Sequence, residues 1–374
     1  MDMNALPIFV TFLVAFIVCW VLMPPFINIM EKYRILDKSG GRKIHSGYTA
    51  HLGGVVIALS FSVAIVSTLF TYRQEVALLR MLYFAILMLI MLFVGIRDDM
   101  NNLSPMAKLC FEIMVGFAMA YAGLKITDFT TFNNTVVHIP EFLSYALTIF
   151  FFIVVCNSYN LIDGIDGQAG MQAINTFLFI FLFFFIYAED SSPFTMLTSD
   201  FMSMICVAII GSLLGFLKFN WQKARVFMGD TGSLFIGTMI TIVLIMATKY
   251  AFACTFIEDN GYIIRLKSTV VPFVCFFYLP LADTLRVFVG RVLKKKSPFS
   301  ADKTHIHHIL LHLGYSHQRI TLTTFTISFL ISVISVALAF VLNDVEFAIV
   351  LVLSWFVYVY VIYSVARKLL HKKL

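Results

Sequence analysis

The chain has 374 residues, of which 60% are hydrophobic and 13% are charged, and its formal net charge at pH 7 is +6. A water-soluble core of this size could not bury so much apolar surface, which excludes an ordinary soluble domain. Lipid must cover the remainder. We therefore expect an all-α, polytopic integral membrane protein.

Apolar runs long enough to cross about 30 Å of hydrocarbon recur along the whole chain. They predict eleven membrane spans, at 5–27, 52–70, 78–96, 106–123, 141–158, 170–187, 200–217, 231–249, 269–290, 321–341 and 347–366. No large soluble segment remains between them, so residues 1–374 are expected to form a single transmembrane domain. The first run lacks a basic flank and an obvious cleavage site, and is expected to be retained.

Basic residues divide unequally between the two sides of these spans. Most of the 27 Lys and Arg residues fall on the side of the C-terminus, which the positive-inside rule places in the cytoplasm, with the N-terminus outside. The polar clusters share that side, in five segments at 28–51, 97–106, 157–170, 218–232 and 290–320. Such a basic, histidine-rich surface suits a polyanionic substrate, although the basic residues could also only set topology and hold anionic lipid.

The first acidic cluster is the adjacent pair Asp98 and Asp99. Neighbours on a helix point in different directions, so we expect different tasks: one carboxylate near the reacting phosphate or a metal, the other held by Arg97 or Lys108. A pair of acids at a helix end facing water is the alternative. Lys108 also lies four residues before Glu112, a spacing that predicts a neutralised pair within the fourth span, with a phosphate contact as the other interpretation for Lys108.

Polar side chains recur at every third position of the next cluster, which would put them on roughly one face of a helical turn. They are Asn157, Asn160, Asp163 and Asp166. Gly164 and Gly167 should bend or end that turn. The full ligand ladder of a calcium loop is missing, which excludes that class of site, whereas ordinary Asp-Gly turn chemistry stays open as the alternative.

Carboxylates beside a phosphorylated substrate need a divalent cation, and Mg²⁺ prefers a few protein oxygens together with substrate phosphates. Asp230 lies in Gly-Asp-Thr-Gly-Ser, where small neighbours let phosphate oxygens approach and Gly232 and Ser233 open the next apolar helix. Asp230 could equally cap that helix, and the two roles are compatible.

The last cluster contains three histidines in four positions, His305, His307 and His308, in a segment rich in Lys and Arg. Adjacent histidines without cysteine make a zinc site the weaker interpretation. Hydrogen bonds to phosphate or sugar oxygens are the stronger one, with purely structural histidines as the alternative.

Together these clusters resemble the polyprenyl-phosphate N-acetylhexosamine-1-phosphate transferases, of the glycosyltransferase 4 type, over essentially the whole chain. The segments that carry the resemblance are RKIHSGYTAHLGG (42–54), GIRDD (95–99), NSYNLIDGIDG (157–167), FMGDTGS (227–233) and PLADTLRVFVGRVLKKKSPFSADKTHIHH (280–308). The His-x-His-His form is more similar to the branch that uses UDP-N-acetylglucosamine than to the muramyl-pentapeptide branch.

The resemblance implies transfer of a sugar 1-phosphate from a UDP-N-acetylhexosamine to undecaprenyl phosphate, with release of UMP, at the cytoplasmic face of a bacterial inner membrane. Mg²⁺ is the implied cofactor, with Mn²⁺ as an alternative ion; Asn160 and Asp230 match the metal-binding positions. The residues expected to act in catalysis are Asp98, Asp99, Asp163 and Asp166. Those expected to bind substrate are Lys43, Lys108, Asn157, Arg286, His305, His307 and His308.

Three other functions stay open at this point. The muramyl-pentapeptide transferase branch differs only in its donor. A secondary transporter of a phosphorylated metabolite fits the number of spans, but transporters tend to show related halves and polar sites at mid-membrane. A scaffold for envelope assembly would not need the acidic clusters. Membrane lipid is an expected partner and nucleic acid is not, whereas the sequence leaves open whether the chain forms a homodimer.

Overall fold

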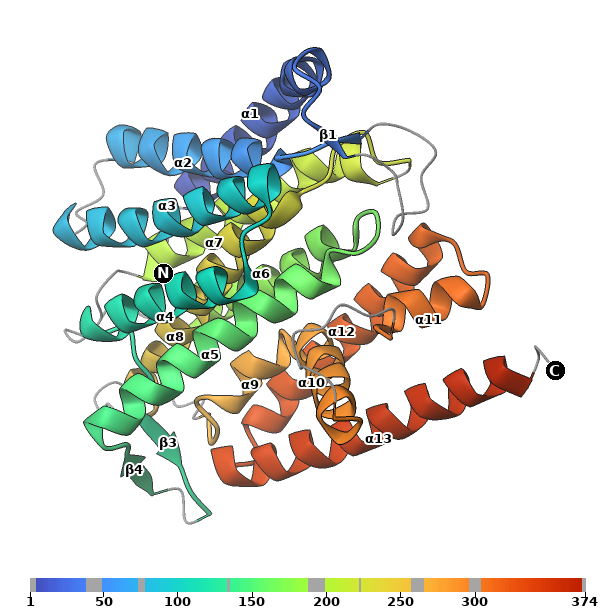
Figure 1. The fold of residues 1–374 in the computed structure, drawn as a ribbon. Helices are drawn as coiled ribbons and strands as arrows, with labels where there is room; N and C mark the ends of the chain where they lie inside the picture. Colours follow the sequence, from blue (N-terminus) through green and yellow to red (C-terminus); the bar gives the residue numbers. More distant parts are fainter. Residues whose placement is uncertain are drawn as a thin grey trace.

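The computed structural model describes residues 5–37, 49–72, 78–132, 135–187, 199–221, 223–256, 266–295 and 304–371. Long helices dominate these residues, and the strands form only two short antiparallel pairs, β1 with β2 and β3 with β4 (Figure 1). The expected all-α fold is therefore confirmed.

The helices are α1 (Ala5–Lys32), α2 (Gly53–Tyr72), α3 (Leu78–Asn101), α4 (Pro105–Tyr121), α5 (Glu141–Ile162), α6 (Gln168–Tyr187), α7 (Ser199–Asn220), α8 (Gly229–Phe256), α9 (Val271–Cys275), α10 (Tyr278–Leu293), α11 (Ile306–His312), α12 (His317–Ala339) and α13 (Asp344–His371). The strands are β1 (Leu36–Asp37), β2 (Thr49–Ala50), β3 (Asp128–Thr130) and β4 (Val136–His138).

Nine helices among the described residues are long and apolar enough to cross a membrane, which makes the chain a multi-pass membrane protein. They correspond to nine of the eleven expected spans. The other two expected spans, 106–123 and 269–290, coincide with α4, which has 17 residues, and with the short helices α9 and α10, which meet at Phe276 and Phe277.

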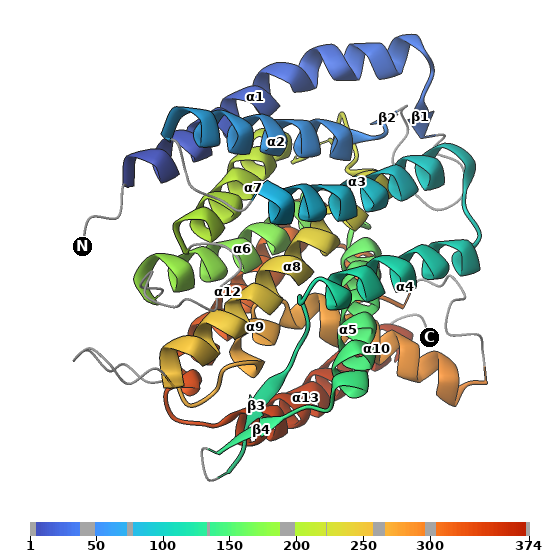
Figure 2. The ribbon, with the colours of Figure 1, turned by 90° about the vertical axis from the view of Figure 1, so that its left-hand side faces the viewer.

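Helix α8 lies at the centre of the bundle, where α2, α3, α5 and α6 pack around it (Figure 2). At the N-terminus of α8, the backbones of α2 and α3 approach so closely that only glycine, which has no Cβ atom, fits at the points of contact. A Cβ atom on Gly54 would lie 2.1 Å from the backbone nitrogen of Gly232, and one on Gly95 would lie 2.4 Å from the Cα of Thr231. These two glycines let α2 and α3 bring their own polar ends against the start of α8.

Different structural elements lie at the two ends of the helical bundle. At one end, α3 and α5 finish where α2, α6, α8 and α12 begin, beside β1 and β2 (Figure 1). At the opposite end, the β3–β4 hairpin lies near the starts of α9 and α13 (Figure 2). The acidic clusters of the sequence all fall at the first of these ends.

Candidate active site

A cleft with a volume of about 110 Å³ opens at the end of the bundle where α8 begins. All five polar segments expected from the sequence contribute to its walls. The lining residues are His51, Asp99, Asn160, Asp163, Gly164, Ile165, Asp166, Phe227, Gly229, Asp230, His308, Leu311 and His317. Six of the predicted site residues therefore share one cavity: Asp99, Asn160, Asp163, Asp166, Asp230 and His308.

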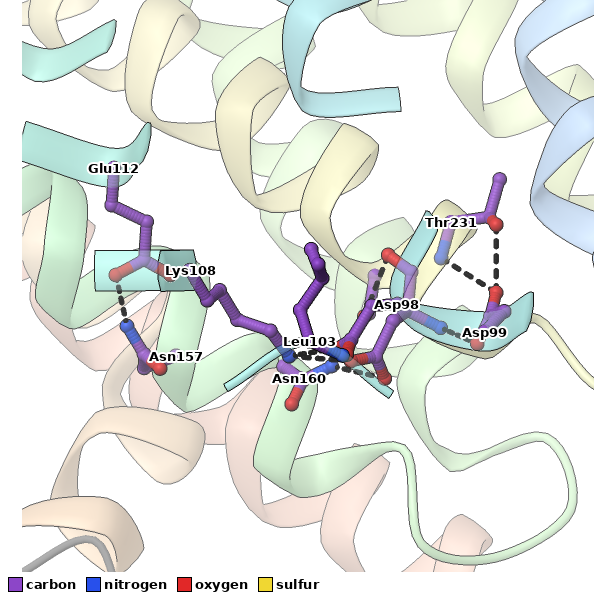
Figure 3. Close-up of polar contacts among 10 residues, drawn as sticks. Asp98, Asp99, Leu103, Lys108, Glu112, Asn157, Asn160 and Thr231 are labelled. Atoms are coloured by element: carbon purple, nitrogen blue, oxygen red, sulfur yellow. Dashed lines mark hydrogen bonds and ion pairs between the residues drawn. The ribbon is translucent and has the colours of Figure 1, made fainter. Parts of the chain in front are cut away.

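Asp99, at the end of α3, caps the first turn of α8 from outside that helix. Its Oδ1 accepts the backbone N–H of Asp230 at 2.8 Å, and its Oδ2 accepts the backbone N–H of Thr231 at 2.9 Å and the Thr231 hydroxyl at 2.7 Å (Figure 3). A helix N-terminus leaves its first N–H groups without intrahelical partners and favours negative charge. Asp99 therefore accepts the backbone N–H groups at the start of α8, the capping role that the sequence suggested for Asp230.

Asp98 points away from its neighbour, as expected for adjacent positions on a helix. One carboxylate oxygen accepts the backbone N–H of Leu103 at 2.6 Å, and the other pairs with the ammonium of Lys108 (Figure 3). The same ammonium lies 2.5 Å from Oδ2 of Asp230. Lys108 thus bridges the two carboxylates, and the predicted pairing of one member of the acid pair with Lys108 is seen for Asp98. The contact of the other member with a phosphate or a metal stays a prediction.

The predicted pairing of Lys108 with Glu112 was wrong. Lys108 extends toward Asp98 and Asp230, whereas Glu112 accepts a hydrogen bond from Nδ2 of Asn157 at 2.7 Å (Figure 3). The i, i+4 spacing is correct for a contact within one helix, but two carboxylates from other helices lie closer to the ammonium. Asn157 therefore faces α4 and does not line the cleft.

Asn160, one turn after Asn157 on α5, lies directly against Asp230. Its amide nitrogen donates to Oδ1 of Asp230 and to the hydroxyl of Ser233, both at 2.8 Å. Asp230 is thereby held between an amide from α5 and the Lys108 ammonium from α4. This geometry fixes the orientation of its carboxylate at the cleft wall.

The turn between α5 and α6 follows the predicted glycine positions. The last residue of α5 is Ile162, and Asp163 is its C-cap. Gly167 adopts a φ of +74° just before α6 begins. Asp166 is buried, and its Oδ2 accepts the backbone N–H of Ala224 at 3.3 Å while its backbone oxygen accepts the Thr321 hydroxyl at 3.0 Å. The turn therefore joins three polar segments at the cleft.

The three predicted histidines occupy three different environments. His308 lines the cleft. His307 is buried, and a Cβ atom on Gly164 would lie 2.4 Å from its Nε2, so its ring fills the space beside the α5–α6 turn. Burial, reinforced by the neighbouring His308 and His305, lowers the pKa of His307 to about 3, which keeps it neutral.

His305 and Arg286 belong to a cluster centred on Asp283 of α10, which lies outside the nine candidate spans. Asp283 accepts from Nη2 of Arg286 at 2.7 Å and pairs with Nδ1 of His305 at 2.8 Å. Burial alone would raise the pKa of Asp283, but the His305 hydrogen bond and the Arg286 charge outweigh burial and lower this pKa to about 2. Neither Arg286 nor His305 lines the cleft.

Sequence reasoning missed three residues that the structure brings into or beside the site. His51 and His317 line the cleft, and Asp283 holds the histidine segment. The signal for Asp283 was its position three residues before Arg286, and His51 and His317 lie at or near the ends of predicted polar segments. Lys43, predicted to bind substrate, lies outside the described residues.

The donor atoms of the site suit a hard cation. Asp98 and Asp230 direct carboxylate oxygens at one point, and a positive group, the Lys108 ammonium, binds there. No three His, Cys, Asp or Glu side chains of the described ranges are grouped to hold a metal by themselves. Mg²⁺ does not need such a cage, because one or two carboxylates suffice when substrate phosphates supply further oxygens. Asp230 has its carboxylate at this point and Asn160 lies against it, and the binding of Mg²⁺ by these two residues stays a prediction.

Comparison with known proteins finds one family model that matches the part of the chain that carries these residues. Residues 81–248, which include Asp98, Asp99, Asn160 and Asp230, match the family model described as Glycosyl transferase family 4. The family match thus covers the helices that build most of the cleft, from α3 to α8.

The chain is also similar to curated proteins over most of its length. The chain is 27% identical to a protein of Bacillus subtilis named probable undecaprenyl-phosphate N-acetylglucosaminyl 1-phosphate transferase, over 90% of this chain and 87% of that one. It is 28% identical to an undecaprenyl-phosphate alpha-N-acetylglucosaminyl 1-phosphate transferase of Yersinia pestis, over 90% and 86%. A decaprenyl-phosphate N-acetylglucosaminephosphotransferase of Mycobacterium tuberculosis is 28% identical over 75% and 70%.

Proposed function

We propose that the protein transfers N-acetylglucosamine 1-phosphate from UDP-N-acetylglucosamine to undecaprenyl phosphate, releasing UMP, at the cytoplasmic face of a bacterial membrane. The observation that carries this proposal is the convergence of Asp99, Asn160 and Asp230 in one cleft, next to the Asp98–Lys108 pair. The names of the relatives supply the sugar and the lipid. The UDP group follows from the resemblance of the sequence motifs to the transferase family.

Phosphoryl transfer needs little covalent work from a protein, because positioning and charge neutralisation account for most of the catalysis. A phosphate oxygen of the lipid attacks the sugar-bearing phosphorus of the donor, and UMP leaves. The Lys108 ammonium, which bridges Asp98 and Asp230, offsets part of the negative charge that these carboxylates place beside this reaction. When bound, Mg²⁺ would add charge neutralisation at the donor diphosphate, held by Asp230 and Asn160.

Asp99 fits orientation better than obligatory proton abstraction. Both of its carboxylate oxygens already accept hydrogen bonds from α8. A phosphate monoester has its second pKa near about 6, so most of the lipid acceptor is already dianionic at neutral pH. The reaction therefore does not require a base to remove a proton from the acceptor.

The direct test is to incubate the purified protein in detergent with UDP-N-acetylglucosamine, undecaprenyl phosphate and Mg²⁺, and to measure UMP and lipid-linked sugar. We expect both products in equal amounts, and we expect chelation by EDTA to stop their formation. Asp230→Ala should lower kcat about a thousandfold or more, because an electrostatic group at the reacting phosphates is lost.

The matched control is Glu141→Ala, which removes an exposed carboxylate that pairs with Lys125 at the opposite end of the bundle. This variant should keep wild-type kcat. Absence of UMP with the wild-type protein would refute the transferase proposal, and normal activity of Asp230→Ala would refute the role assigned to Asp230.

A further inference from the structure

Helix α13 is mostly exposed along its length, yet one face of it reaches α10 through three polar contacts. The hydroxyl of Ser354 donates to the hydroxyl of Tyr278 at 3.0 Å, and Nε1 of Trp355 donates to the backbone oxygen of Ala282 at 3.1 Å. The hydroxyl of Tyr358 donates to Oδ1 of Asp283 at 3.0 Å. The last of these contacts joins α13 to the cluster that holds the histidine segment.

Asp283 is 3% exposed and receives donors from three separate parts of the chain. Arg286 belongs to α10 itself, and Tyr358 belongs to α13, 75 residues away. His305 and the backbone N–H of Ile306, which lies 3.2 Å from both carboxylate oxygens, form the start of α11. A buried carboxylate with several charge-assisted bonds holds its partners in one arrangement, and loss of one donor disturbs the others.

The short helix α11 transmits this arrangement to the cleft. Its seven residues begin at Ile306, directly on Asp283, and His308 lines the cleft two residues later. The His307 ring lies 4.3 Å from the His308 ring, measured between centroids, and fills the space above Gly164. His308 is thus linked to the Asp283 cluster through the start of α11, and to the α5–α6 turn through the ring of His307.

We propose that Tyr358 is a positioning residue for the active site. Its hydroxyl acts through Asp283 and the start of α11 to determine the position of His308 in the cleft. Helix α13 is thereby coupled to substrate binding. This inference rests on the proposed function, because the substrate that His308 meets is taken to be the sugar nucleotide. Small displacements of a binding group have large effects on affinity and rate.

The test compares Tyr358→Phe, which removes only the hydroxyl, with Tyr360→Phe, which removes the same group from an exposed tyrosine on the same helix. We expect Tyr358→Phe to raise KM for UDP-N-acetylglucosamine about five- to tenfold, since a hydrogen bond to a buried charge is lost. Its kcat and its KM for undecaprenyl phosphate should stay within about twofold of wild type. Tyr360→Phe should match the wild type in all three values.

A purely structural role would give a different pattern, with fewer active molecules, a lower apparent kcat and an unchanged KM. That result, or identical kinetics for Tyr358→Phe and Tyr360→Phe, would overturn the inference. A second measurement repeats the comparison in a His308→Ala background. If Tyr358 acts through His308, the effect of Tyr358→Phe should disappear there, whereas additive effects would contradict the proposed route.

The two proposals fail separately. If wild-type protein forms no UMP from UDP-N-acetylglucosamine and undecaprenyl phosphate, the proposed function is wrong. If the wild type is active and Tyr358→Phe keeps a wild-type KM for the donor, only the positioning role is wrong.

Discussion

Two aspartates at opposite ends of the bundle perform the same physical task. Asp99 accepts the first N–H groups of α8. Asp344, at the start of α13, accepts the backbone N–H groups of Thr269, Val270 and Val271, which lead into α9. Asp344 also binds β3, accepting from the backbone N–H of Thr130 at 2.9 Å and from its hydroxyl at 2.8 Å. Each carboxylate thus fixes the start of a helix that does not contain it.

The surroundings of the two caps differ. Asp344 is 3% exposed, and the donors that contact it are backbone amides and the hydroxyls of Thr130, Ser268 and Thr269. Asp99 lines the cleft. The helix start that it caps carries a second carboxylate, Asp230, which forms an ion pair with the Lys108 ammonium. A capping carboxylate by itself therefore indicates structure. Chemistry needs the additional acid, the cation and the access that the described residues provide at the α8 end.

The sharpest way to break this comparison is Asp99→Asn. The side-chain amide would turn an N–H donor toward the N–H donors of α8, which should displace Asp230 and lower kcat about a hundredfold or more. Because Asp99 acts by orientation, the remaining activity should keep the wild-type dependence on pH, measured by UMP release between pH 6 and 9. A flattened acidic limb would instead identify Asp99 as a general base.

Asp344→Asn should produce the opposite outcome. The same amide would meet several buried donors, so the protein should lose about 3 kcal/mol of stability, seen as a lower midpoint of thermal unfolding in detergent. Molecules that remain folded at low temperature should keep wild-type kcat and KM. A fall in kcat with an unchanged midpoint would show that the two ends of the bundle are functionally coupled.

The sequence predicts the α8 end well and the α9 end poorly, for a physical reason. Asp98, Asp99, Asn160 and Asp230 lie in dense polar clusters beside apolar runs, a local pattern that is costly in a membrane and therefore informative. Asp344 and Asp283 are single acids next to apolar segments. Their partners lie far along the chain, 214 residues away for Thr130 and 75 for Tyr358. No local spacing encodes such contacts.

The same limit explains the error at Lys108. Its spacing to Glu112 describes contacts within one helix, whereas its actual partners come from α3 and α8 and meet it only after the bundle has formed. The break between α9 and α10 has a local cause that the apolar run 269–290 conceals. Pro280 has no N–H to offer the carbonyl of Phe276, and that carbonyl accepts from Asn175 and Thr176 of α6 instead. Helix starts and turns such as Gly167 follow local rules, and these were predicted.

Gly54→Ala tests whether the capping of α8 by Asp99 depends on the close approach of α2 to α8. It therefore shows whether the cap at the α8 end, unlike the one at the α9 end, is sensitive to helix packing. The new methyl group would meet the backbone of Gly232, so α8 or α2 must shift. We expect about 2 kcal/mol less stability and about tenfold lower kcat. Gly290→Ala is the matched control, because no atom lies within 4 Å of its Cβ position. It should leave kcat unchanged and stabilise α10 by about 0.5–1 kcal/mol.

His307 adds to the comparison a buried polar group that must stay uncharged, whereas Asp99 and Asp344 accept hydrogen bonds through their carboxylates. Its pKa is lowered from 6.5 to about 3 in the folded protein, so the unfolded chain takes up the proton first as the pH falls. The stability that the neutral ring contributes is therefore complete above about pH 6.5 and is lost progressively toward pH 3.

Between pH 7 and 5.5 this loss should reach about 1 kcal/mol, measured as the difference in unfolding midpoint between the wild type and His307→Gln, whose side chain does not titrate. The variant is expected to be less stable than the wild type at pH 7, since the glutamine fills the space beside Gly164 less well. Its deficit should narrow as the pH falls. A constant difference across this range would mean that His307 is protonated alike in both states, and that α11 packs against the turn less tightly than the structure shows.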